Sequence, residues 1–207
     1  MVMYCLWQMY ILRLDFSMYI ERIIYPVLVL GIGKRIGIWV QGCPHKCKGC
    51  INPELWEQQE KNNISVKKII DTMQKICDER EVDGFTITGG EPFFQTEELS
   101  YLLSELVKFN KEILVYTGYQ KCEIQSFQNG ASMLECIDVL IDGKYLEEQN
   151  YSDLTLRGSA NQKIYYKDDI TQNKYKEYIL QGRKLQNIYS DEYMLSLGIH
   201  NRRNKNE

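Results

Sequence analysis

The chain has 207 residues, of which 44% are hydrophobic and 26% are charged, and its formal net charge at pH 7 is -3. This length predicts about one domain, and the composition excludes collagen-like, low-complexity and globally disordered classes. Because 25 Lys and Arg residues nearly balance 28 Asp and Glu residues, charge gives no reason to expect a nucleic-acid partner.

The N-terminal segment, residues 1–12, carries no charge. It lacks the basic region of a secretory signal, and Arg13 and Asp15 end it before the roughly 18 apolar residues that a membrane span needs. The next apolar run, residues 23–32, is also too short, so the sequence predicts no membrane span. We expect residues 1–18 to be an extension, with Met18 as an alternative start of the protein.

Short apolar runs alternate along the chain with amphipathic helical patterns. Runs of β-branched and aromatic residues predict strands from residue 19 onward and over residues 36–40, 85–88, 113–116 and 137–141. Apolar residues at helical spacing predict helices over residues 65–80, with Ser65 as N-cap, and over 96–109, with a weaker helix over 122–134. Strands separated by such helices indicate an α/β fold with a mostly parallel sheet.

The C-terminal part of the chain has a weaker pattern. Residues 150–207 are polar and rich in Tyr, and strand candidates occur at residues 163–166 and 193–197. We therefore predict a single domain over residues 19–200 with an irregular C-terminal extension, and a frayed tail over residues 201–207.

Seven cysteines are an odd number with no secretory signal before them, which predicts reduced thiols in the cytoplasm. Three of them, Cys43, Cys47 and Cys50, form a C-x3-C-x2-C motif directly after the strand predicted over residues 36–40. Thiolates bind iron in iron–sulfur clusters, and three cysteines can hold three irons of a [4Fe-4S] cluster and leave the fourth iron open. An open metal position is what catalysis requires, so a cluster is the preferred interpretation.

Three other interpretations of this motif stay open. A structural zinc site needs a fourth ligand, for which His45 would strain the loop, and the other cysteines stand at no recognisable spacing. A redox pair is disfavoured by a reducing compartment and by three thiols instead of two. Buried unligated thiols are disfavoured because the loop is polar and rich in turn residues. The remaining cysteines are expected to be structural: Cys5, Cys77, Cys122 and Cys136.

A second motif, Gly-Gly-Glu-Pro at residues 89–92, follows the strand predicted over residues 85–88. Ligands of open α/β sheets bind outside the carboxyl ends of the strands, and glycines let the backbone approach a ligand closely. Glu91 would add a negative charge or fix the loop, and Pro92 would stiffen it. The alternative interpretation is a simple turn before a helix, with Glu91 exposed.

The cysteine motif after one strand and Gly-Gly-Glu-Pro after the next resemble the radical S-adenosylmethionine (radical SAM) enzymes. The wider string GKRIGIWVQGCPHKCKGCINPELW is similar to the compact glycyl-radical-activating enzymes, above all the family that activates anaerobic ribonucleotide reductase. IDVLIDGKYL and RGSANQKIYY are similar to segments of that family, so the resemblance covers roughly residues 19–166. Gly49 replaces the aromatic residue of many radical SAM proteins, as it does in this branch. Gly198-Ile199-His200 stands in place of a Gly-Ile-Pro-like turn.

The resemblance implies an incomplete parallel (β/α) barrel that binds a [4Fe-4S] cluster through Cys43, Cys47 and Cys50, with S-adenosylmethionine at the open iron. Reductive cleavage of S-adenosylmethionine would then generate a glycyl radical on anaerobic ribonucleoside-triphosphate reductase, with reduced flavodoxin or ferredoxin as the electron donor. Among the predicted cofactor-binding residues, the resemblance implies Gly49, Cys50 and Ile51. The others are predicted from their positions at strand ends: Gly89, Gly90, Glu91 and Thr117.

The resemblance leaves the partner and several residues open. Another glycyl radical enzyme or a ribosomally made peptide is an alternative substrate. A non-catalytic iron–sulfur protein is a third interpretation, against which the intact Gly-Gly-Glu-Pro motif argues. Residues 116–118 and 142–144 also end strands and are candidates for contacts with the ribose or the methionine carboxylate. We assign no role to Asp142, Lys144, Arg157, Asn161 and Gln162.

Overall fold

The computed structural model describes residues 16–190 and 194–201. The expectations for Cys5 and for the tail after residue 201 lie outside these residues, as does most of the N-terminal extension. The first strand begins at Ser17, so Ser17 and Met18 belong to the sheet, and the Met18 side chain is fully buried. Across the described ranges, no helix is both long enough and apolar enough to cross a membrane.

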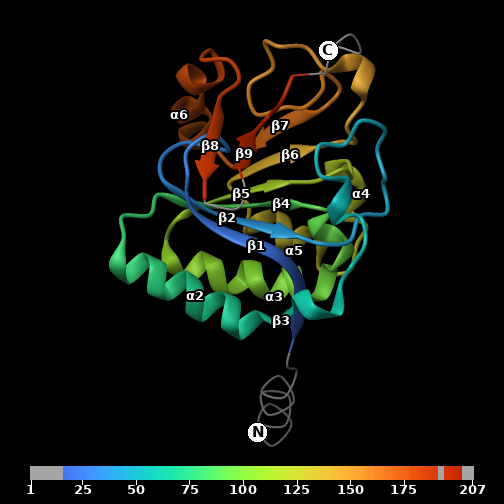
Figure 1. Ribbon diagram of the computed structural model, residues 1–207. Coiled ribbons are helices and arrows are strands. Elements are labelled where there is room, and N and C mark those ends of the chain that lie inside the picture. The colour runs from blue at the N-terminus through green and yellow to red at the C-terminus, as the bar shows by residue number, and fades with distance from the viewer. Residues whose placement is uncertain (1–15, 191–193, 202–207) are drawn as a thin grey trace, which may run out of the picture.

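An open sheet of seven strands runs through the molecule in the order β3-β1-β2-β4-β5-β6-β7 (Figure 1). Its central strands β2, β4, β5 and β6 are parallel, whereas β1, β3 and β7 join antiparallel to their neighbours. The bounds are β1 Ser17–Val27, β2 Arg35–Val40, β3 Asn63–Ser65, β4 Gly84–Gly89, β5 Glu112–Tyr116, β6 Val139–Asp142 and β7 Lys163–Tyr166. A separate antiparallel hairpin consists of β8 Leu185–Tyr189 and β9 Met194–Gly198.

The two faces of the sheet are covered by different elements (Figure 1). The helices on one face are α2 Val66–Glu79, α3 Thr96–Leu106, α4 Lys121–Gln125 and α5 Gly130–Glu135. The other face carries α6 Asp169–Ile179 and the hairpin of β8 and β9. Ser65 caps α2 as predicted, because its side chain accepts a hydrogen bond from the Lys68 amide.

Alternate residues of the parallel strands form two apolar layers. Ile36, Ile38 and Phe85 pack in the large core with α2 and α3. Trp39 and Leu114 belong to smaller clusters with the hairpin and with α6. Because both faces of these strands are buried, their sequences are continuous apolar runs with little polar alternation.

The predicted strands and helices before residue 145 are confirmed, with one difference. The weaker helix over residues 122–134 is two helices, α4 and α5, which Asn129 separates by taking a left-handed conformation at φ 60°. The predicted parallel α/β sheet is likewise confirmed for its central strands.

The prediction of an irregular C-terminal extension is wrong. Strands at 163–166 and near 193–197 are confirmed, but the region also contains α6 and β8. The buried residues of α6 are Thr171 and Tyr175, so its apolar stripe is too narrow for helical periodicity to reveal it.

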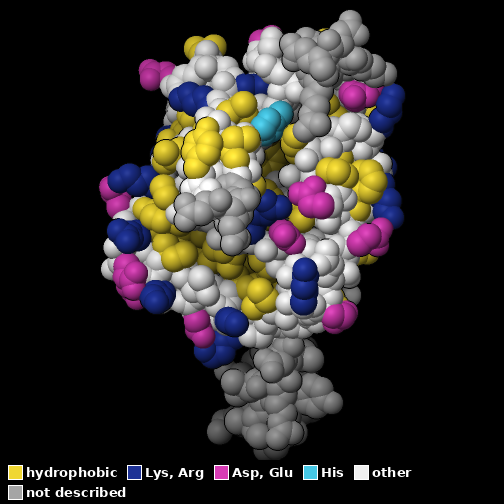
Figure 2. Space-filling view, in the orientation of Figure 1, with side chains coloured by type: hydrophobic (Ala, Val, Ile, Leu, Met, Phe, Trp, Pro, Cys, Tyr) yellow, Lys and Arg dark blue, Asp and Glu magenta, His cyan; other side chains and the backbone are white. Residues whose placement is uncertain are grey.

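The hairpin of β8 and β9 is attached to the sheet by both polar and apolar contacts. The Gln186 side chain accepts from the Leu28 amide at 2.9 Å and donates to the Pro26 carbonyl at 2.8 Å. Leu197 is buried on the inner side of the hairpin in the cluster that contains Trp39. On the outer side, Leu185, Tyr189 and Met194 are exposed, and Figure 2 shows apolar side chains gathered over this part of the molecule.

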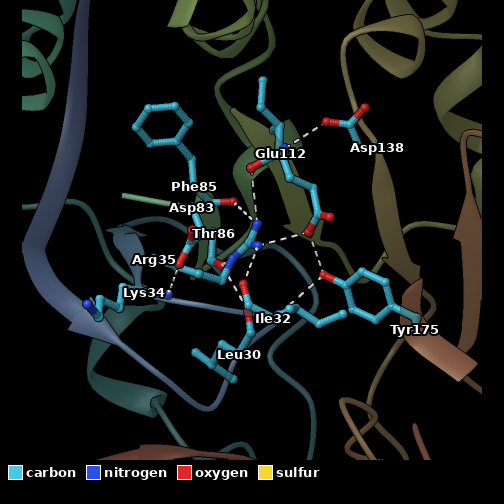
Figure 3. Close-up of polar contacts among 11 residues, drawn as sticks. Leu30, Ile32, Lys34, Arg35, Asp83, Phe85, Thr86, Glu112, Asp138 and Tyr175 are labelled. Atoms are coloured by element: carbon cyan, nitrogen blue, oxygen red, sulfur yellow. Dashed lines mark hydrogen bonds and ion pairs between the residues drawn. The ribbon is translucent and has the colours of Figure 1, made fainter. Parts of the chain in front are cut away.

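A polar network ties the amino ends of the central strands to α6 (Figure 3). The fully buried Arg35 guanidinium donates to the Thr86 hydroxyl at 2.7 Å and to the Phe85 carbonyl at 2.6 Å, and it pairs with the Glu112 carboxylate at 2.8 Å. The Tyr175 hydroxyl donates to the same carboxylate. Burial raises the pKa of Tyr175, so this hydroxyl stays protonated and remains a donor. The network therefore joins β2, β4 and β5 to α6.

Removing the charge of Arg35 should strongly destabilise the fold. The Arg35 and Glu112 side chains are 1% and 15% exposed, so Arg35→Met leaves a mostly buried carboxylate without its cation. We expect a loss of about 3 kcal/mol in the free energy of unfolding, measured by urea denaturation. The control, Lys67→Met, breaks an ion pair whose side chains are 77% and 62% exposed, and it should cost about 0.5 kcal/mol or less. Equal losses in both variants would contradict this account.

Candidate active site

The cysteine motif lies in a loop that returns to the end of β2. The Gly42 and Cys43 amides donate to the carbonyls of Leu55 and Trp56, both at 2.9 Å. The Gln41 side chain accepts from the Gln59 amide at 3.0 Å, and Leu55 is fully buried beneath the loop. These hydrogen bonds and the buried Leu55 side chain therefore fix the position of the loop.

All three motif cysteines line one cavity of about 580 Å³. Burial raises the pKa of Cys43 and Cys47, while hydrogen bonds from the backbone act in the opposite sense. For Cys43 these come from His45 and Lys46, and for Cys47 from Tyr145. Backbone donors that stabilise a thiolate are what a metal-binding sulfur requires, because metals bind the deprotonated form.

The two glycines of Gly-Gly-Glu-Pro bring the end of β4 against the cysteine loop. The Gly90 amide donates to the Val40 carbonyl and the Glu91 amide to the Gly42 carbonyl, both at 2.8 Å. A Cβ atom on Gly90 would lie 2.4 Å from the Gly42 carbonyl oxygen, and Gly89 has φ +114°. A side chain at either position would force the end of β4 away from the cysteine loop. The two glycines therefore allow these segments to pack closely, and they also line the cavity.

The Glu91 carboxylate is fully buried and contacts four donors. One oxygen accepts from the Phe93 amide at 3.0 Å and the Thr117 hydroxyl at 2.8 Å. The other accepts from the Gly118 amide at 2.6 Å and lies 3.1 Å from His45 Nε2. The interpretation with an exposed Glu91 is wrong, since this side chain is 1% exposed. Glu91 was predicted either to add a negative charge at the site or to fix the loop. Its hydrogen bonds show that it fixes the loop.

His45, expected to be a simple loop residue near the cluster, is an ordered part of this site. Its side chain is 6% exposed and packs edge-on against the Tyr119 ring, with ring centroids 4.5 Å apart. Because an ionised carboxylate can only accept, the Nε2–H group donates to Glu91. His45 therefore connects the cysteine loop to the ends of β4 and β5.

The loops after β5 and β6 are held together by hydrogen bonds. The Thr117 amide donates to the Ile141 carbonyl at 2.9 Å, and Asp142 accepts from the Lys121 amide at 2.8 Å. The Gln162 side chain donates to the Gly143 carbonyl and accepts from the Gly158 amide. In the same way the Asn161 amide group donates to the Lys144 carbonyl, and Arg157 donates to the Gln162 carbonyl. Of the residues without an assigned role, Gln162 lines the cavity, and the other four take part in the hydrogen bonds of the loops around it.

Most predicted site residues meet at the cavity. Those that line it are Cys43, Cys47, Gly49, Cys50, Ile51, Gly89, Gly90 and Thr117. Glu91 lies behind this wall, and its contact with a cofactor stays a prediction. Cys77 and Cys136 pack at the edge of the large core and Cys122 is exposed, away from the cavity. Tyr116, Gly118 and Gly143, from the two strand-end segments that the sequence offered as candidates, also line it. The sequence did not indicate Trp56, Tyr145 or His200, which line it as well.

The donor set fits an iron–sulfur cluster. Its three cysteine thiols come from one loop and line the same cavity. In a [4Fe-4S] cluster each cysteine binds a different iron, so three cysteines can hold three of the four irons.

Comparison with known proteins agrees with this site. The domain family described as "4Fe-4S single cluster domain" matches residues 29–165. An anaerobic ribonucleoside-triphosphate reductase-activating protein from Haemophilus influenzae is 36% identical over 149 residues, which cover 68% of this chain and 94% of that protein. The protein of the same name from phage T4 is 35% identical over 152 residues, covering 70% and 93%.

The chain belongs to this family of activating proteins. The family member from Escherichia coli K12 is 30% identical over 148 residues, which cover 69% of this chain and 95% of that protein. The resemblance inferred from the motifs is therefore confirmed. The solved structure of QueE from Escherichia coli is less similar, with a TM-score of 0.41 and 20% identity over 49% of this chain and 53% of that one.

Removing the Glu91 carboxylate should destabilise the protein even without metal. Glu91→Ala leaves four buried donors without an acceptor, and each such group costs about 1–3 kcal/mol. We expect a total loss of roughly 3 kcal/mol or more, and a smaller loss for Glu91→Gln, whose amide oxygen still accepts.

The measurement is urea denaturation of the metal-free, reduced protein. Glu97→Ala on α3 is the control, because Glu97 is exposed and its removal should cost about 0.5 kcal/mol. If Glu91→Ala were no more costly than Glu97→Ala, the carboxylate would not hold the site together.

Proposed function

We propose that the protein is a radical SAM activating enzyme that generates a glycyl radical on anaerobic ribonucleoside-triphosphate reductase. The observation that carries the proposal is the position of Cys43, Cys47 and Cys50 on the wall of one cavity at the carboxyl ends of parallel strands. Membership of a family whose curated members carry that reductase in their name supplies the partner. We place this activity in the cytoplasm, where the thiols stay reduced.

Three cysteine thiolates would hold three irons of a [4Fe-4S] cluster. When bound and reduced, such a cluster supplies one electron for cleavage of the sulfonium C–S bond of S-adenosylmethionine, which ends in removal of a hydrogen atom from a glycine. The backbone at Gly49, Cys50 and Ile51 lines the same cavity, as do Gly89 and Gly90, so these residues are placed to bind the cofactor beside the cluster. Glu91 and His45 orient the cysteine loop against these strand ends.

We infer that the sheet is the wall of an incomplete barrel of the radical SAM type. Helices α2 to α5 cover one face, and the other face carries the cavity-lining C-terminal segment after β9. The terminal strands β3 and β7 each pair with one neighbour in the sheet, so the sheet is not closed. An open wall leaves access for a protein segment that bears the target glycine, and for reduced flavodoxin or ferredoxin as electron donor.

Substitution of any motif cysteine should abolish cluster assembly. Cys43→Ala, Cys47→Ala and Cys50→Ala should each lose the iron–sulfur absorbance and the stoichiometric iron and sulfide after anaerobic reconstitution, because each removes one of three ligands. Cys122→Ala is the matched control, since Cys122 is exposed and away from the cavity, and it should load like the unsubstituted protein. One bound zinc per chain and no iron would overturn the proposal.

The activity itself is tested on the loaded, reduced protein. With S-adenosylmethionine it should release 5′-deoxyadenosine, and with the reductase it should produce the paramagnetic resonance signal of a glycyl radical. An intact cluster that gives no 5′-deoxyadenosine would contradict an enzymatic role. Release of 5′-deoxyadenosine without a radical on the reductase would contradict this choice of partner.

A further inference from the structure

The cavity has a wall that the cysteine and glycine motifs do not supply. It is formed by residues 198–201, which are the last residue of β9 and the segment after it, and by Asn150 and Gly158 from the loop before β7. Gly198 has φ +123°, and a Cβ atom there would lie 2.3 Å from the Lys184 carbonyl oxygen. Glycine at this position therefore lets the chain leave the hairpin and turn along the cavity.

One side chain, Arg183, holds both parts of this wall. It lies between α6 and β8, and its guanidinium donates to acceptors from two separate segments. In the loop before β7 the acceptors are Leu154 O at 3.1 Å, Arg157 O at 3.0 Å, Gly158 O at 3.1 Å and Asn150 Oδ1. In the segment after β9 they are His200 O at 2.9 Å and Asn201 Oδ1 at 3.0 Å.

The chemistry of these contacts allows Arg183 to hold the loop before β7 and the segment after β9 together, an arrangement that we call the clamp. A guanidinium presents five N–H donors in a rigid plane, so it can hold several carbonyl groups at fixed relative positions. Arg183 has no carboxylate partner within ion-pair distance in the part of the chain that the structure describes. Its donors are directed instead at backbone and amide oxygens. Asn150 strengthens the clamp by donating to the Tyr145 hydroxyl and to the His200 carbonyl.

We propose that Arg183 is a positioning residue for S-adenosylmethionine, because it fixes residues 198–201 as a wall of the cofactor cavity. Arg183 is not among the residues that line the cavity, so it acts through the wall and not by contact. The inference rests on the proposed function, which names the ligand. Loss of the clamp weakens binding of the cofactor and leaves the cysteine loop, which is held by separate hydrogen bonds, able to load its cluster.

The test compares Arg183→Gln and Arg183→Lys with Lys174→Gln, which removes an exposed cation from α6. Binding of S-adenosylmethionine to the cluster-loaded proteins is measured by equilibrium dialysis. Arg183→Gln should raise the dissociation constant about tenfold or more. Arg183→Lys should have an intermediate effect, since an ammonium group donates fewer hydrogen bonds. Lys174→Gln should bind like the unsubstituted protein.

Two further readouts separate positioning from general damage to the fold. In the metal-free protein, amide hydrogen exchange over residues 194–201 should accelerate in Arg183→Gln and not in Lys174→Gln, while β2 and β4 keep their protection. At saturating S-adenosylmethionine, the rate of 5′-deoxyadenosine release should be unchanged by Arg183→Gln.

The outcomes distinguish this inference from the function on which it rests. If the unsubstituted, loaded protein did not bind S-adenosylmethionine, the proposed function would fall and the inference with it. If that protein bound and Arg183→Gln bound equally well, the inference alone would be overturned. Loss of cluster loading in Arg183→Gln would also overturn it, because the residue would then support the whole fold.

Discussion

The geometry of the site depends on the carboxylate of Glu91. This buried group receives donors from the cysteine loop through His45 and from the end of β5 through Thr117 and Gly118, while its own backbone continues β4. A buried charge is costly unless its acceptor positions are matched. The segments that carry these donors must therefore come together in the arrangement that satisfies it.

This constraint prepares the cysteine loop before any metal binds. Iron binds the thiolate form, so Cys43 and Cys47 must lose their protons when the cluster loads. Burial raises the pKa of both thiols, which makes this deprotonation more costly. A loop that is already tied to the strand ends loses little conformational entropy when its thiolates bind. Because Glu91 already fixes the cysteine loop, the small entropy loss on binding offsets part of the cost of deprotonating the thiols. The fixed loop also keeps the cysteines beside the glycines that line the same cavity.

The sequence predicts those features whose pattern lies within a short stretch of the chain, and it does not predict contacts between residues that are far apart in the sequence. The strands and helices before residue 145, the cysteine motif and Gly-Gly-Glu-Pro follow from short-range patterns. The role of His45 does not, because its partner Glu91 lies 46 residues away along the chain. Helix α6 was missed because its buried face is Thr171 and Tyr175. Arg183 gave no signal, since most of its acceptors are backbone carbonyls, which no side-chain pattern reveals.

Charged side chains stand at both ends of the parallel strands and have different consequences. At the amino ends, Arg35 meets a carboxylate and joins core strands to α6, so its contribution is to stability. At the carboxyl ends, Glu91 is matched by donors that come from loops, and Arg183 is matched by carbonyls of the C-terminal wall. The cavity is therefore enclosed by segments whose positions depend on hydrogen bonds to buried or half-buried charges. Such contacts have strict directional requirements, whereas apolar packing tolerates small shifts, so these charges give the cavity a definite shape that the core beneath it could not impose.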